Sequence, residues 1–541
     1  MKIVIAEKVS PATIAVLAGE PEWRIVTQDQ IKNGLAAELN DADALVVRSA
    51  VQVDNALLEH APKLRVIGRA GVGVDNIDAT AATHRGIVVM NTPGANAVAV
   101  AELTIGLMLA LARQLPKANT TLHAGKWEKK SLQGAELRGK QLGILGLGRV
   151  GLEVARRAKN FGMELAGHDP FVSPAVAREN DVRLCSLDEL FRGADYLTLH
   201  VGLTPQTAGI INAQSLASMK KNVRIINCAR GELIDDQALV DALKSGKAAG
   251  AALDVFSKEP LKDSPYFGLE NVILTPHIAG STAEAQEAVG VQIAMQVKEY
   301  LKFGVVQNAV NLPSLTHEEY QELAPYITMA ERLGAFLSPL ASGNVESIHL
   351  SYSGRLSQGK TELVRNSAIQ GVLAHSEHVN RINALSVAGE RGIRVHEEKQ
   401  DAVAGGAGSV LKLTLHTRAG DRTASATVLH GHSPRLLSCD GIDIEVPLHG
   451  TLLFLRNRDV PGVIGRIGTI LGEHRINIAN FALGRSLQAS ETNAPAIALA
   501  VVQVDGRVTR DALDSLEAAD AIIEVRLIEI EEPQPEYATV E

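Results

Sequence analysis

Short runs of apolar residues alternate with polar, helix-forming stretches along the first part of the chain. The runs at 2–6, 44–47, 66–68 and 88–90 each end in a polar or glycine-rich turn. Runs of this length, separated by helical segments, predict parallel β-strands that are covered by helices. The alternation resumes further along, and we expect more strands at 140–145, 164–167, 196–200, 223–227, 249–255 and 272–275.

Two long helical segments interrupt this alternation. Ala97–Ala112 is the most apolar stretch of the chain, but it is short for a membrane span and contains Glu102 and Thr104. We therefore expect a buried helix there. Thr282–Phe303 predicts a second long helix that runs back towards the first group of strands. The pattern thus predicts one domain formed by residues 1–97 and 285–311, with a second domain, residues 98–284, inserted in it.

The chain changes character after a linker at 308–314. Residues 312–447 predict an α+β domain with a helical pair at about 317–342, strands at 348–352 and 410–417, and a glycine-rich turn at 405–408. Residues 448–530 predict a βαββαβ unit with elements at 451–455, 462–474, 478–483, 496–502, 509–518 and 522–528. The acidic, proline-containing tail 531–541 is expected to be loosely held.

Composition and charge narrow the class of protein. The 541 residues are 46% hydrophobic, which is typical of a globular chain of several domains. The net charge is −9 without a basic block, so neither nucleic acid nor an anionic membrane is expected as a partner. The N-terminus carries Glu7 where a signal peptide needs an apolar run. The chain has three scattered cysteines, Cys185, Cys228 and Cys439, which predict neither a disulfide framework nor a metal site. This low cysteine content fits a cytoplasmic location.

The motif Gly-Leu-Gly-Arg-Val-Gly follows the strand expected at 140–145 and opens a helix. In this G-x-G-x-x-G spacing, Gly146 permits a tight turn, Gly148 lets the backbone approach a pyrophosphate, and Gly151 lets helix and strand pack closely. The helix N-terminus presents free N–H groups to phosphates. Asp169, after the next strand, can accept hydrogen bonds from both ribose hydroxyls and would repel a 2′-phosphate, which predicts NAD as cofactor. The alternative is a glycine-rich structural turn.

Three ionisable residues follow later strands of the same predicted sheet: Arg230, Glu259 and His277. Because the carboxyl ends of parallel strands meet at one edge, they can converge. A histidine is a suitable base for an alcohol proton near neutral pH, a carboxylate beside it holds its tautomer, and an arginine fork binds a substrate carboxylate. The set predicts oxidation of a hydroxy acid by NAD. Each residue also has a structural alternative: a histidine in a turn, a glutamate that ends a turn, and an arginine in a surface ion pair.

Four motifs resemble those of the D-isomer-specific 2-hydroxyacid dehydrogenases: Gly-Leu-Gly-Arg-Val-Gly, Asn-Cys-Ala-Arg-Gly, Ala-Ala-Leu-Asp-Val-Phe and Thr-Pro-His-Ile-Ala-Gly. Arg69-Ala-Gly-Val-Gly-Val-Asp-Asn and Asn91-Thr-Pro-Gly-Ala-Asn are similar to the branch of that family that oxidises phosphoglycerate. The resemblance is dense over about residues 1–310. It implies an α/β fold in which a Rossmann-type nucleotide domain is inserted in a flavodoxin-like substrate domain, and it implies that Arg230, Glu259 and His277 are catalytic.

The resemblance also implies the residues that contact each ligand, with Asp254 near the nicotinamide amide. Contacts with NAD are expected from Gly146, Gly148, Arg149, Val150, Gly151, Asp169, Thr204, Cys228, Ala229, Asp254, His277 and Gly280. Contacts with substrate are expected from Arg48, Arg69, Gly71, Val72, Gly73, Asn96 and Lys129. Arg48 and Arg69 follow short strands and suit a phosphate. Relatives often have Thr in place of Val72, and the position of Lys129 reaches a neighbouring subunit's site in relatives.

The unit at 448–530 resembles an ACT domain, and residues 312–447 resemble the intervening domain of the long form of the family. In serine-regulated relatives the positions of Asn457, Asp459 and Asn477 hold L-serine. An Asx residue before Pro-Gly can instead cap the helix expected from Gly462, and the two roles are compatible.

Taken together, the resemblance implies NAD-dependent oxidation of 3-phospho-D-glycerate to 3-phosphohydroxypyruvate, the first step of L-serine biosynthesis. Regulation by L-serine and a homo-oligomer, either dimer or tetramer, are further expectations. Two alternatives stay open. One is another D-2-hydroxyacid dehydrogenase that acts on glycerate or hydroxypyruvate, and the other is an NAD-sensing binding protein on the same fold.

Overall fold

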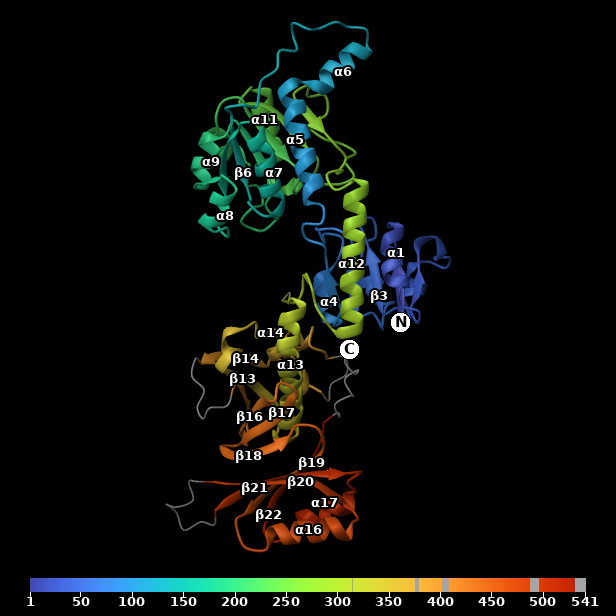
Figure 1. Cartoon of the computed structure of the whole chain (residues 1–541), viewed down its shortest axis with the longest axis vertical. Coiled ribbons are helices and arrows are strands. Elements are labelled where there is room, and N and C mark those ends of the chain that lie inside the picture. Colours follow the sequence, from blue (N-terminus) through green and yellow to red (C-terminus); the bar gives the residue numbers. More distant parts are fainter. Residues whose placement is uncertain (314, 375–378, 401–407, 487–495, 531–541) are drawn as a thin grey trace.

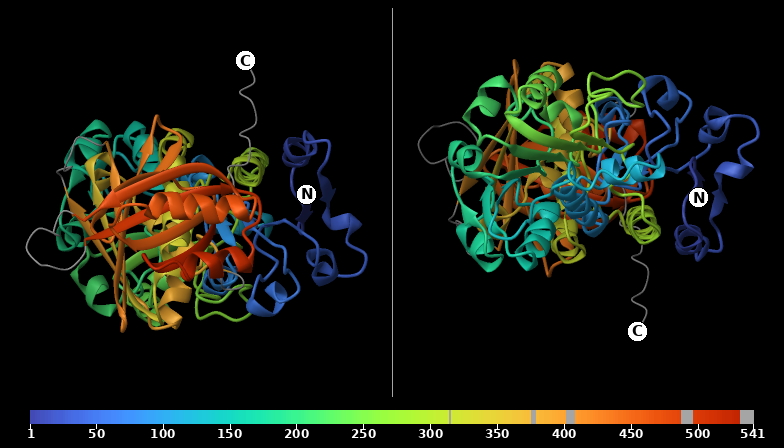
Figure 2. Two further views of the ribbon diagram at one scale, coloured as in Figure 1. Left: turned by 90° about the horizontal axis from the view of Figure 1, so that it is seen from below. Right: turned by 90° about the horizontal axis from the view of Figure 1, so that it is seen from above.

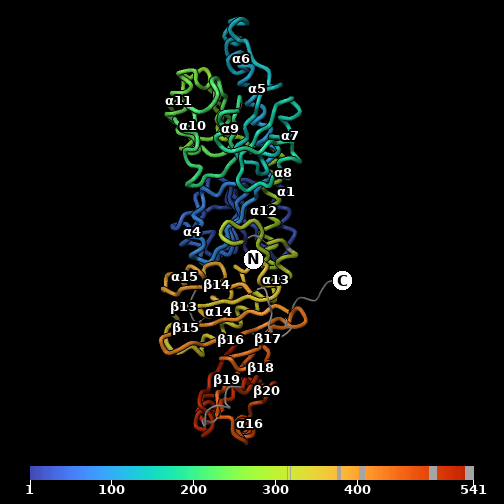
Figure 3. Tube along the Cα trace, turned by 90° about the vertical axis from the view of Figure 1, so that its left-hand side faces the viewer, coloured from blue at the N-terminus to red at the C-terminus, as the bar shows by residue number. Residues whose placement is uncertain are grey.

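The computed structural model describes residues 1–541 except 314, 375–378, 401–407, 487–495 and 531–541. Four units follow one another along its long axis, each built on one β-sheet (Figure 1; Figure 3). The tail 531–541 lies outside the described residues, and so does the turn expected at 405–408 apart from Gly408.

The first unit has a five-stranded parallel sheet in the order β2-β1-β3-β4-β5, the order of flavodoxin-like folds. The four strands expected from the apolar runs are confirmed. The sequence analysis missed β2, which is only three residues long and begins at the exposed Arg24. The elements are β1 Lys2–Ile5, α1 Pro11–Ala18, β2 Arg24–Val26, α2 Leu35–Leu39, β3 Ala44–Val47, α3 Asn55–Leu58, β4 Val66–Arg69, α4 Ala79–His84 and β5 Val88–Met90.

The second unit has a seven-stranded parallel sheet in the order β12-β11-β10-β9-β6-β7-β8, which is the Rossmann order with an added strand. The order reverses between β6 and β9, and at such a point the loops after the strands leave a crevice for a ligand. The strands are β6 Gln141–Leu145, β7 Glu164–His168, β8 Arg183–Leu184, β9 Tyr196–Leu199, β10 Val223–Asn227, β11 Ala248–Leu253 and β12 Val272–Leu274. The helices are α7 Arg149–Asn160, α8 Pro174–Glu179, α9 Leu187–Gly193, α10 Ala213–Ser218 and α11 Asp236–Lys244.

Two long helices connect these units, as the sequence predicted: α5 Ala97–Arg113 and α12 Ala283–Phe303. The helix α12 runs back along the first sheet and packs closely on β4, where a Cβ added to Gly68 would lie 2.8 Å from the side chain of Ile293. A bend of 63° separates α5 from α6 Leu115–His123. Within the described residues no single helix is long and apolar enough to span a membrane, although this bent pair passes the same test together.

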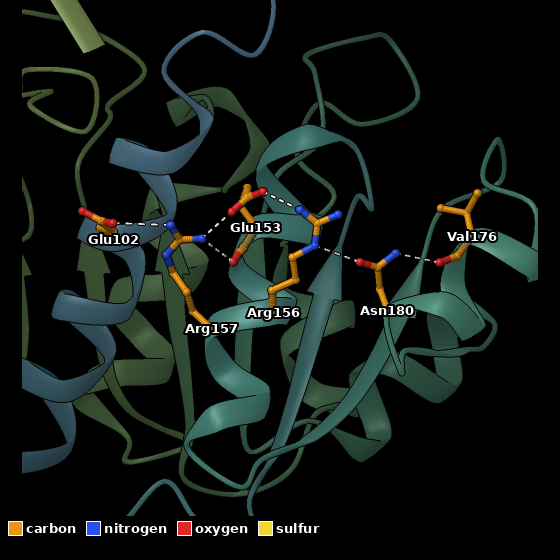
Figure 4. A network of polar contacts seen from close by, with 6 residues as sticks. All are labelled: Glu102, Glu153, Arg156, Arg157, Val176 and Asn180. Carbon is orange, nitrogen blue, oxygen red and sulfur yellow. Dashed lines mark hydrogen bonds and ion pairs between the residues drawn. The ribbon is translucent and has the colours of Figure 1, made fainter. Parts of the chain in front are cut away.

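A polar network holds α5 against the second unit (Figure 4). Arg157 of α7 pairs with Glu153 one turn earlier and reaches Glu102 of α5 over 3.4 Å. Arg156 bonds the other oxygen of Glu153 at 2.6 Å and Asn180 at 3.1 Å. The paired arginines lower the pKa of Glu153, with Arg157 the largest cause. Glu102, the charged residue in the apolar helix α5, therefore links α5 to α7.

The third unit has a six-stranded sheet in the order β14-β13-β15-β16-β17-β18. Its elements are α13 His317–Leu337, β13 Val345–Ser353, α14 Glu362–Val372, α15 Ala384–Glu390, β14 Arg394–Gln400, β15 Val410–Thr417, β16 Gly420–Leu429, β17 Ser433–Cys439 and β18 Ile442–Pro447. The helical pair expected at 317–342 is wrong, because α13 continues through Pro325 as one helix. Its partner is α14, and the two backbones meet where a Cβ on Gly334 or Gly371 would lie within 2.2 Å of the other helix.

The fourth unit has the expected βαββαβ order and a four-stranded antiparallel sheet, β20-β21-β19-β22. Its elements are β19 Gly450–Arg458, α16 Val463–Glu473, β20 Asn477–Arg485, β21 Ile497–Asp505, α17 Arg510–Glu517 and β22 Ile522–Ile530. Both helices cover the outer face of the sheet, at the end of the molecule (Figure 1; Figure 2).

One apolar cluster runs through three of the four units. It includes Ile3 of the first sheet, Ile293 of α12, Phe336 of α13 and Phe454 of β19. The second unit has two clusters of its own. The first, third and fourth units therefore form one continuously packed body. The second unit meets that body through the connecting helices and through contacts between loops of the two units, such as the ion pair of Arg230 with Asp75.

Candidate active site

The glycine loop between β6 and α7 has the geometry that each glycine was expected to provide. Gly146 has φ +93°, and a Cβ there would lie 2.6 Å from the carbonyl oxygen of His200. A Cβ on Gly151 would lie 2.0 Å from the carbonyl oxygen of Gly146. Gly148 has no atom within 4 Å of its Cβ position, so its exposed backbone leaves room for a phosphate group at the start of α7.

The carboxylate of Asp169 is fixed beside this loop. Its Oδ2 accepts the amide of Leu147 at 2.8 Å, and its Oδ1 accepts the amide of Phe171 at 2.9 Å. Each oxygen keeps a further lone pair for a ligand. An open glycine loop with a fixed carboxylate just beyond the adjacent strand fits the pyrophosphate and ribose of a dinucleotide.

His277 and Glu259 come together at the edge of the same sheet. Nδ1 of His277 lies 2.7 Å from Oε2 of Glu259, and both side chains are partly exposed. The other carboxylate oxygen accepts the amide of Phe256 at 3.0 Å, so Glu259 closes a turn and orients the imidazole at once. With Nδ1 donating to Glu259, the imidazole keeps Nε2 free to accept a proton. This is the arrangement of a histidine base with a carboxylate that orients it.

Asp254 is completely buried and holds the loop that carries His277. Its carboxylate accepts the hydroxyl of Thr275 at 2.6 Å and the amides of Ile278 at 2.9 Å and Ala279 at 2.8 Å. The loop needs this support because His277 has φ +53°, a left-handed conformation that a side chain disfavours. Asp254 was expected beside the nicotinamide, and the structure gives it three contacts within the protein.

Arg230 follows β10 and is fixed by three groups. Its carbonyl accepts from Nδ2 of the buried Asn227 at 2.8 Å, and its Nη1 donates to the carbonyl of Ala229 at 2.7 Å. Its Nε lies 3.1 Å from Oδ2 of Asp75 in the first unit. Arg230 therefore forms the ion pair that was considered as its structural alternative, and this pair joins the second unit to the first.

A second arginine, Arg69, lies beside this pair and is partly buried. Burial, and next the positive charge of Arg230, hold the pKa of Arg69 below its usual value, while Asp75 opposes them. The Nε of Arg69 is buried without a hydrogen-bond partner among the described residues. Arg48 contributes to the same field and donates from Nη1 to the carbonyl of Lys8 at 3.1 Å. Buried positive charge that lacks a carboxylate partner favours an anionic ligand.

The segment 71–73 lies beside these arginines. The amide of Gly71 donates to the carbonyl of Arg69 at 2.9 Å, so it is not available for the substrate carboxylate that was expected there. The amides of Val72 and Gly73 donate to no acceptor within the described part of the chain. These two amides are the ones that can receive a carboxylate.

The remaining expected cofactor residues have different surroundings. Arg149, in the second unit, donates a hydrogen bond to the carbonyl of Pro93 in the first unit. Burial raises the pKa of Cys228 to about 12, so its thiol stays protonated and acts in packing. Thr204 forms a local turn with Thr207.

Asn96 and Lys129 were both expected at the substrate. The Nδ2 atom of Asn96 lies against Gly280, while its Oδ1 is buried without a partner among the described residues. Lys129 is exposed and lies six residues after the end of α6. The helix α6 lies at the end of the second unit that is remote from the first unit (Figure 1). The structure therefore places Asn96 next to the loop of His277, and within the described part of the chain Lys129 makes no hydrogen bond or ion pair with the site residues.

The expected effector residues lie at two strand ends of the fourth unit. Asn457 is 2% exposed, and its Oδ1 has no partner among the described residues. Asp459 pairs with Arg485 at 3.3 Å, and Asn477 donates to Asp505 at 2.6 Å. The capping alternative is wrong, because α16 begins at Val463 with Gly462 as its N-cap residue, and no side chain caps it.

The sequence analysis missed three residues that shape the site: Asp75, Asn227 and Thr275. Each belongs to a motif that was recognised, and Asn227 ends a predicted strand. A polar residue at the end of a buried parallel strand is itself a signal of a role at the ligand edge. The contact between Asp75 and Arg230 had no such signal, because it depends on how the two units face each other.

In a comparison with known protein families, three segments of the chain match family domains. Residues 105–279 match the D-isomer specific 2-hydroxyacid dehydrogenase NAD binding domain. Residues 322–440 match the D-3-phosphoglycerate dehydrogenase intervening domain, and residues 451–521 match the ACT domain.

Relatives of similar length span nearly the whole chain. A D-3-phosphoglycerate dehydrogenase from Methanocaldococcus jannaschii is 40% identical, over 98% of this chain and 100% of the relative. One from Bacillus subtilis is 35% identical, over 98% and 99%. Among solved structures, a D-lactate dehydrogenase from Aquifex aeolicus, complexed with NAD and lactic acid, is 28% identical with a TM-score of 0.51. It covers 58% of this chain and 100% of that chain.

Proposed function

This chain belongs to the D-3-phosphoglycerate dehydrogenase family, whose members are NAD-dependent oxidoreductases, and we propose that it oxidises 3-phospho-D-glycerate at C2. The product is 3-phosphohydroxypyruvate, and the reaction begins L-serine biosynthesis. The observation that carries the proposal is the pair of His277 and Glu259, 2.7 Å apart, at the edge of the nucleotide-binding sheet. Arg48 and Arg69 of the first unit and Arg230 of the second unit support an anionic substrate.

In this proposal His277 is the general base. Its Nε2 takes the proton of the C2 hydroxyl, while Glu259 holds Nδ1 protonated and stabilises the imidazolium that forms. Asp254 acts through the loop and keeps His277 in place. In the reverse direction the imidazolium returns the same proton to the carbonyl oxygen.

The two ends of the substrate need different partners. Arg230 and the amides of Val72 and Gly73 bind the carboxylate, because a guanidinium fork and free amides match its two oxygens. Arg69 and Arg48 bind the phosphate, and the unpaired Nε of Arg69 supports this assignment.

The cofactor is held by the second unit. The amides at the start of α7 receive its pyrophosphate above Gly148, and Asp169 receives the ribose hydroxyls. Bound NAD supplies the acceptor for the two electrons and the hydrogen that leave C2. The carboxylate of Asp169 excludes a 2′-phosphate by charge repulsion, which favours NAD over NADP.

We also propose the division of the chain made above: a substrate domain of residues 1–97 and 285–311, a nucleotide domain of 98–284, an intervening domain of 312–447 and an ACT domain of 448–530. L-serine is the proposed effector of the ACT domain. The unpaired, buried Oδ1 of Asn457 supports a polar ligand there.

A homo-oligomer, dimer or tetramer, and a cytoplasmic location complete the proposal. The arm that begins with α6 supports an oligomer. It presents Leu115, Leu122 and Trp127 to solvent, with Trp127 82% exposed, beside Lys129. Such a patch favours contact with a second copy.

The experiment is NADH formation from NAD with 3-phospho-D-glycerate and, separately, with D-glycerate. Wild-type turnover restricted to the phosphorylated acid supports the proposal. In Arg48→Ala the KM should rise for the phosphorylated acid alone. Turnover of D-glycerate at an equal rate favours another hydroxyacid dehydrogenase, and no turnover in either direction favours an NAD sensor. Repeating the assay with millimolar L-serine tests the effector assignment.

A further inference from the structure

We propose that Asp75 is a positioning residue: its carboxylate, in the substrate domain, orients the guanidinium of Arg230, in the nucleotide domain, where the two domains meet. The proposal rests on the function proposed above, because it gives Arg230 a substrate carboxylate to bind. It makes correct substrate binding depend on the approach of the two domains.

The contacts of Arg230 leave one edge of its guanidinium for a ligand. Nε lies 3.1 Å from Oδ2 of Asp75, and Nη1 donates to the carbonyl of Ala229 at 2.7 Å. Nη1 keeps a second hydrogen and Nη2 keeps both, so that one hydrogen from each nitrogen can serve the terminal edge of the fork. A carboxylate can therefore be bound in bidentate form by that edge.

Gly73 shows that the substrate domain is shaped to receive this arginine. A Cβ on Gly73 would lie 2.2 Å from Nη2 of Arg230 and 2.9 Å from Oδ2 of Asp75. The guanidinium thus lies directly against the backbone of the other domain, where no side chain fits. Asp75, two residues further on, reaches the same guanidinium from the side.

Folding stability does not account for this ion pair. The side chain of Asp75 is 73% exposed and that of Arg230 is 28% exposed. Exposed pairs of this kind contribute little to stability. What these contacts do limit is the position of the guanidinium, because Nη1 donates to the carbonyl of Ala229 and Nε lies 3.1 Å from the carboxylate of Asp75.

Charge around the site supports the same role. Burial, and then the positive charges of Arg230 and Arg48, lower the pKa of Arg69, and Asp75 is the larger of the two carboxylate influences that oppose them. The other carboxylate, Glu7, is occupied by the amides of Arg48, Ala50 and Val51. In this proposal Asp75 is therefore the carboxylate that offsets the repulsion between Arg69 and Arg230 before the substrate arrives.

The test uses the full-length protein with Asp75→Asn, which removes the charge and keeps the shape. We expect kcat/KM for 3-phospho-D-glycerate to fall roughly 10-fold, because the fork loses its fixed direction. The dissociation constant of NADH, measured by fluorescence, and the Tm should stay at the wild-type values. Asp75→Glu should restore part of the loss. The matched control is Asp188→Asn, an 81% exposed partner of Arg192 on α9, which should change nothing.

A double-mutant comparison separates orientation from a general effect of charge. In an Arg230→Lys background Asp75→Asn should cause little further loss, because an ammonium has no fork to orient. Full additivity would overturn the proposal, and so would an unchanged kcat/KM in Asp75→Asn. A lower KM in Asp75→Asn would also overturn it, since the carboxylate would then be a competitor of the substrate. An inactive wild type would instead refute the proposed function.

Discussion

The buried carboxylate of Asp254 gives the most quantitative prediction, because every contact that it makes lies in the loop of His277. In Asp254→Ala the amides of Ile278 and Ala279 lose their acceptors, and the hydroxyl of Thr275 loses its own. The amide of Ala279 is buried, and leaving it without a partner costs about 1–3 kcal/mol. The amide of Ile278, a residue that is 41% exposed, can turn to water at a smaller cost.

The loop can lower this cost only by moving its amides towards water, which carries His277 away from Glu259. A displacement of about 1 Å at a catalytic group costs about 100-fold in rate. We therefore expect kcat to fall by at least about 100-fold and the Tm to fall by roughly 5 °C or more.

Steady-state NADH formation, thermal unfolding and NADH binding measure the three parts of this prediction. Thr275→Val is the matched control, because it removes one contact of Asp254 and leaves both amides bonded, and it should lose less than about 10-fold in kcat. The reasoning is refuted if Asp254→Ala keeps the kcat of the control. It is also refuted if the main loss is in NADH affinity, since Asp254 would then act on the cofactor.

Three further predictions concern the nucleotide domain. Asp169→Ala should raise the KM for NAD about 10-fold and narrow the preference over NADP, and an unchanged preference would exclude the ribose contact. Gly151→Ala should lower the Tm, since its Cβ would lie 2.0 Å from a carbonyl oxygen. Gly148→Ala should keep the wild-type Tm and weaken NADH binding. The reverse pattern would contradict the loop geometry. Burial lowers the pKa of His200 to about 3, so below a pH of about 6.5 only the unfolded chain takes up this proton. Stability is then full above that pH and falls by about 2 kcal/mol between about pH 7 and pH 5, and His200→Gln should show a smaller drop in Tm over that range.

Local sequence patterns predicted most strands of the two parallel sheets, because these strands are apolar runs that are mainly buried. The short strands β2 and β8 begin at the exposed Arg24 and Arg183, and no apolar run predicted them. The strand β14 has the opposite character, with Arg394, His396 and Glu397 in a seven-residue edge strand, and no apolar pattern marks it. The continuity of α13 through Pro325 also lay beyond local patterns. A proline inside a helical segment ordinarily predicts a break, and here the helix continues through it.

The candidate site was predictable to the extent that strand ends define it. Three adjacent strands place Arg230, Glu259 and His277 at one edge, and this follows from the order of strands in a parallel sheet. The partner of each side chain was not predictable in the same way. The contact of Asp75 with Arg230 joins two domains, and no periodicity in one segment carries information about the surface of another.

The central claim is that His277 is the base of a phosphoglycerate dehydrogenase, and His277→Gln tests it most directly. The measurement is NADH formation from NAD and 3-phospho-D-glycerate by the wild type and the variant, with NADH binding measured on both. The account predicts turnover by the wild type, a loss in the variant of about 100- to 10,000-fold, and equal NADH affinity. A variant that keeps the wild-type rate would contradict the account.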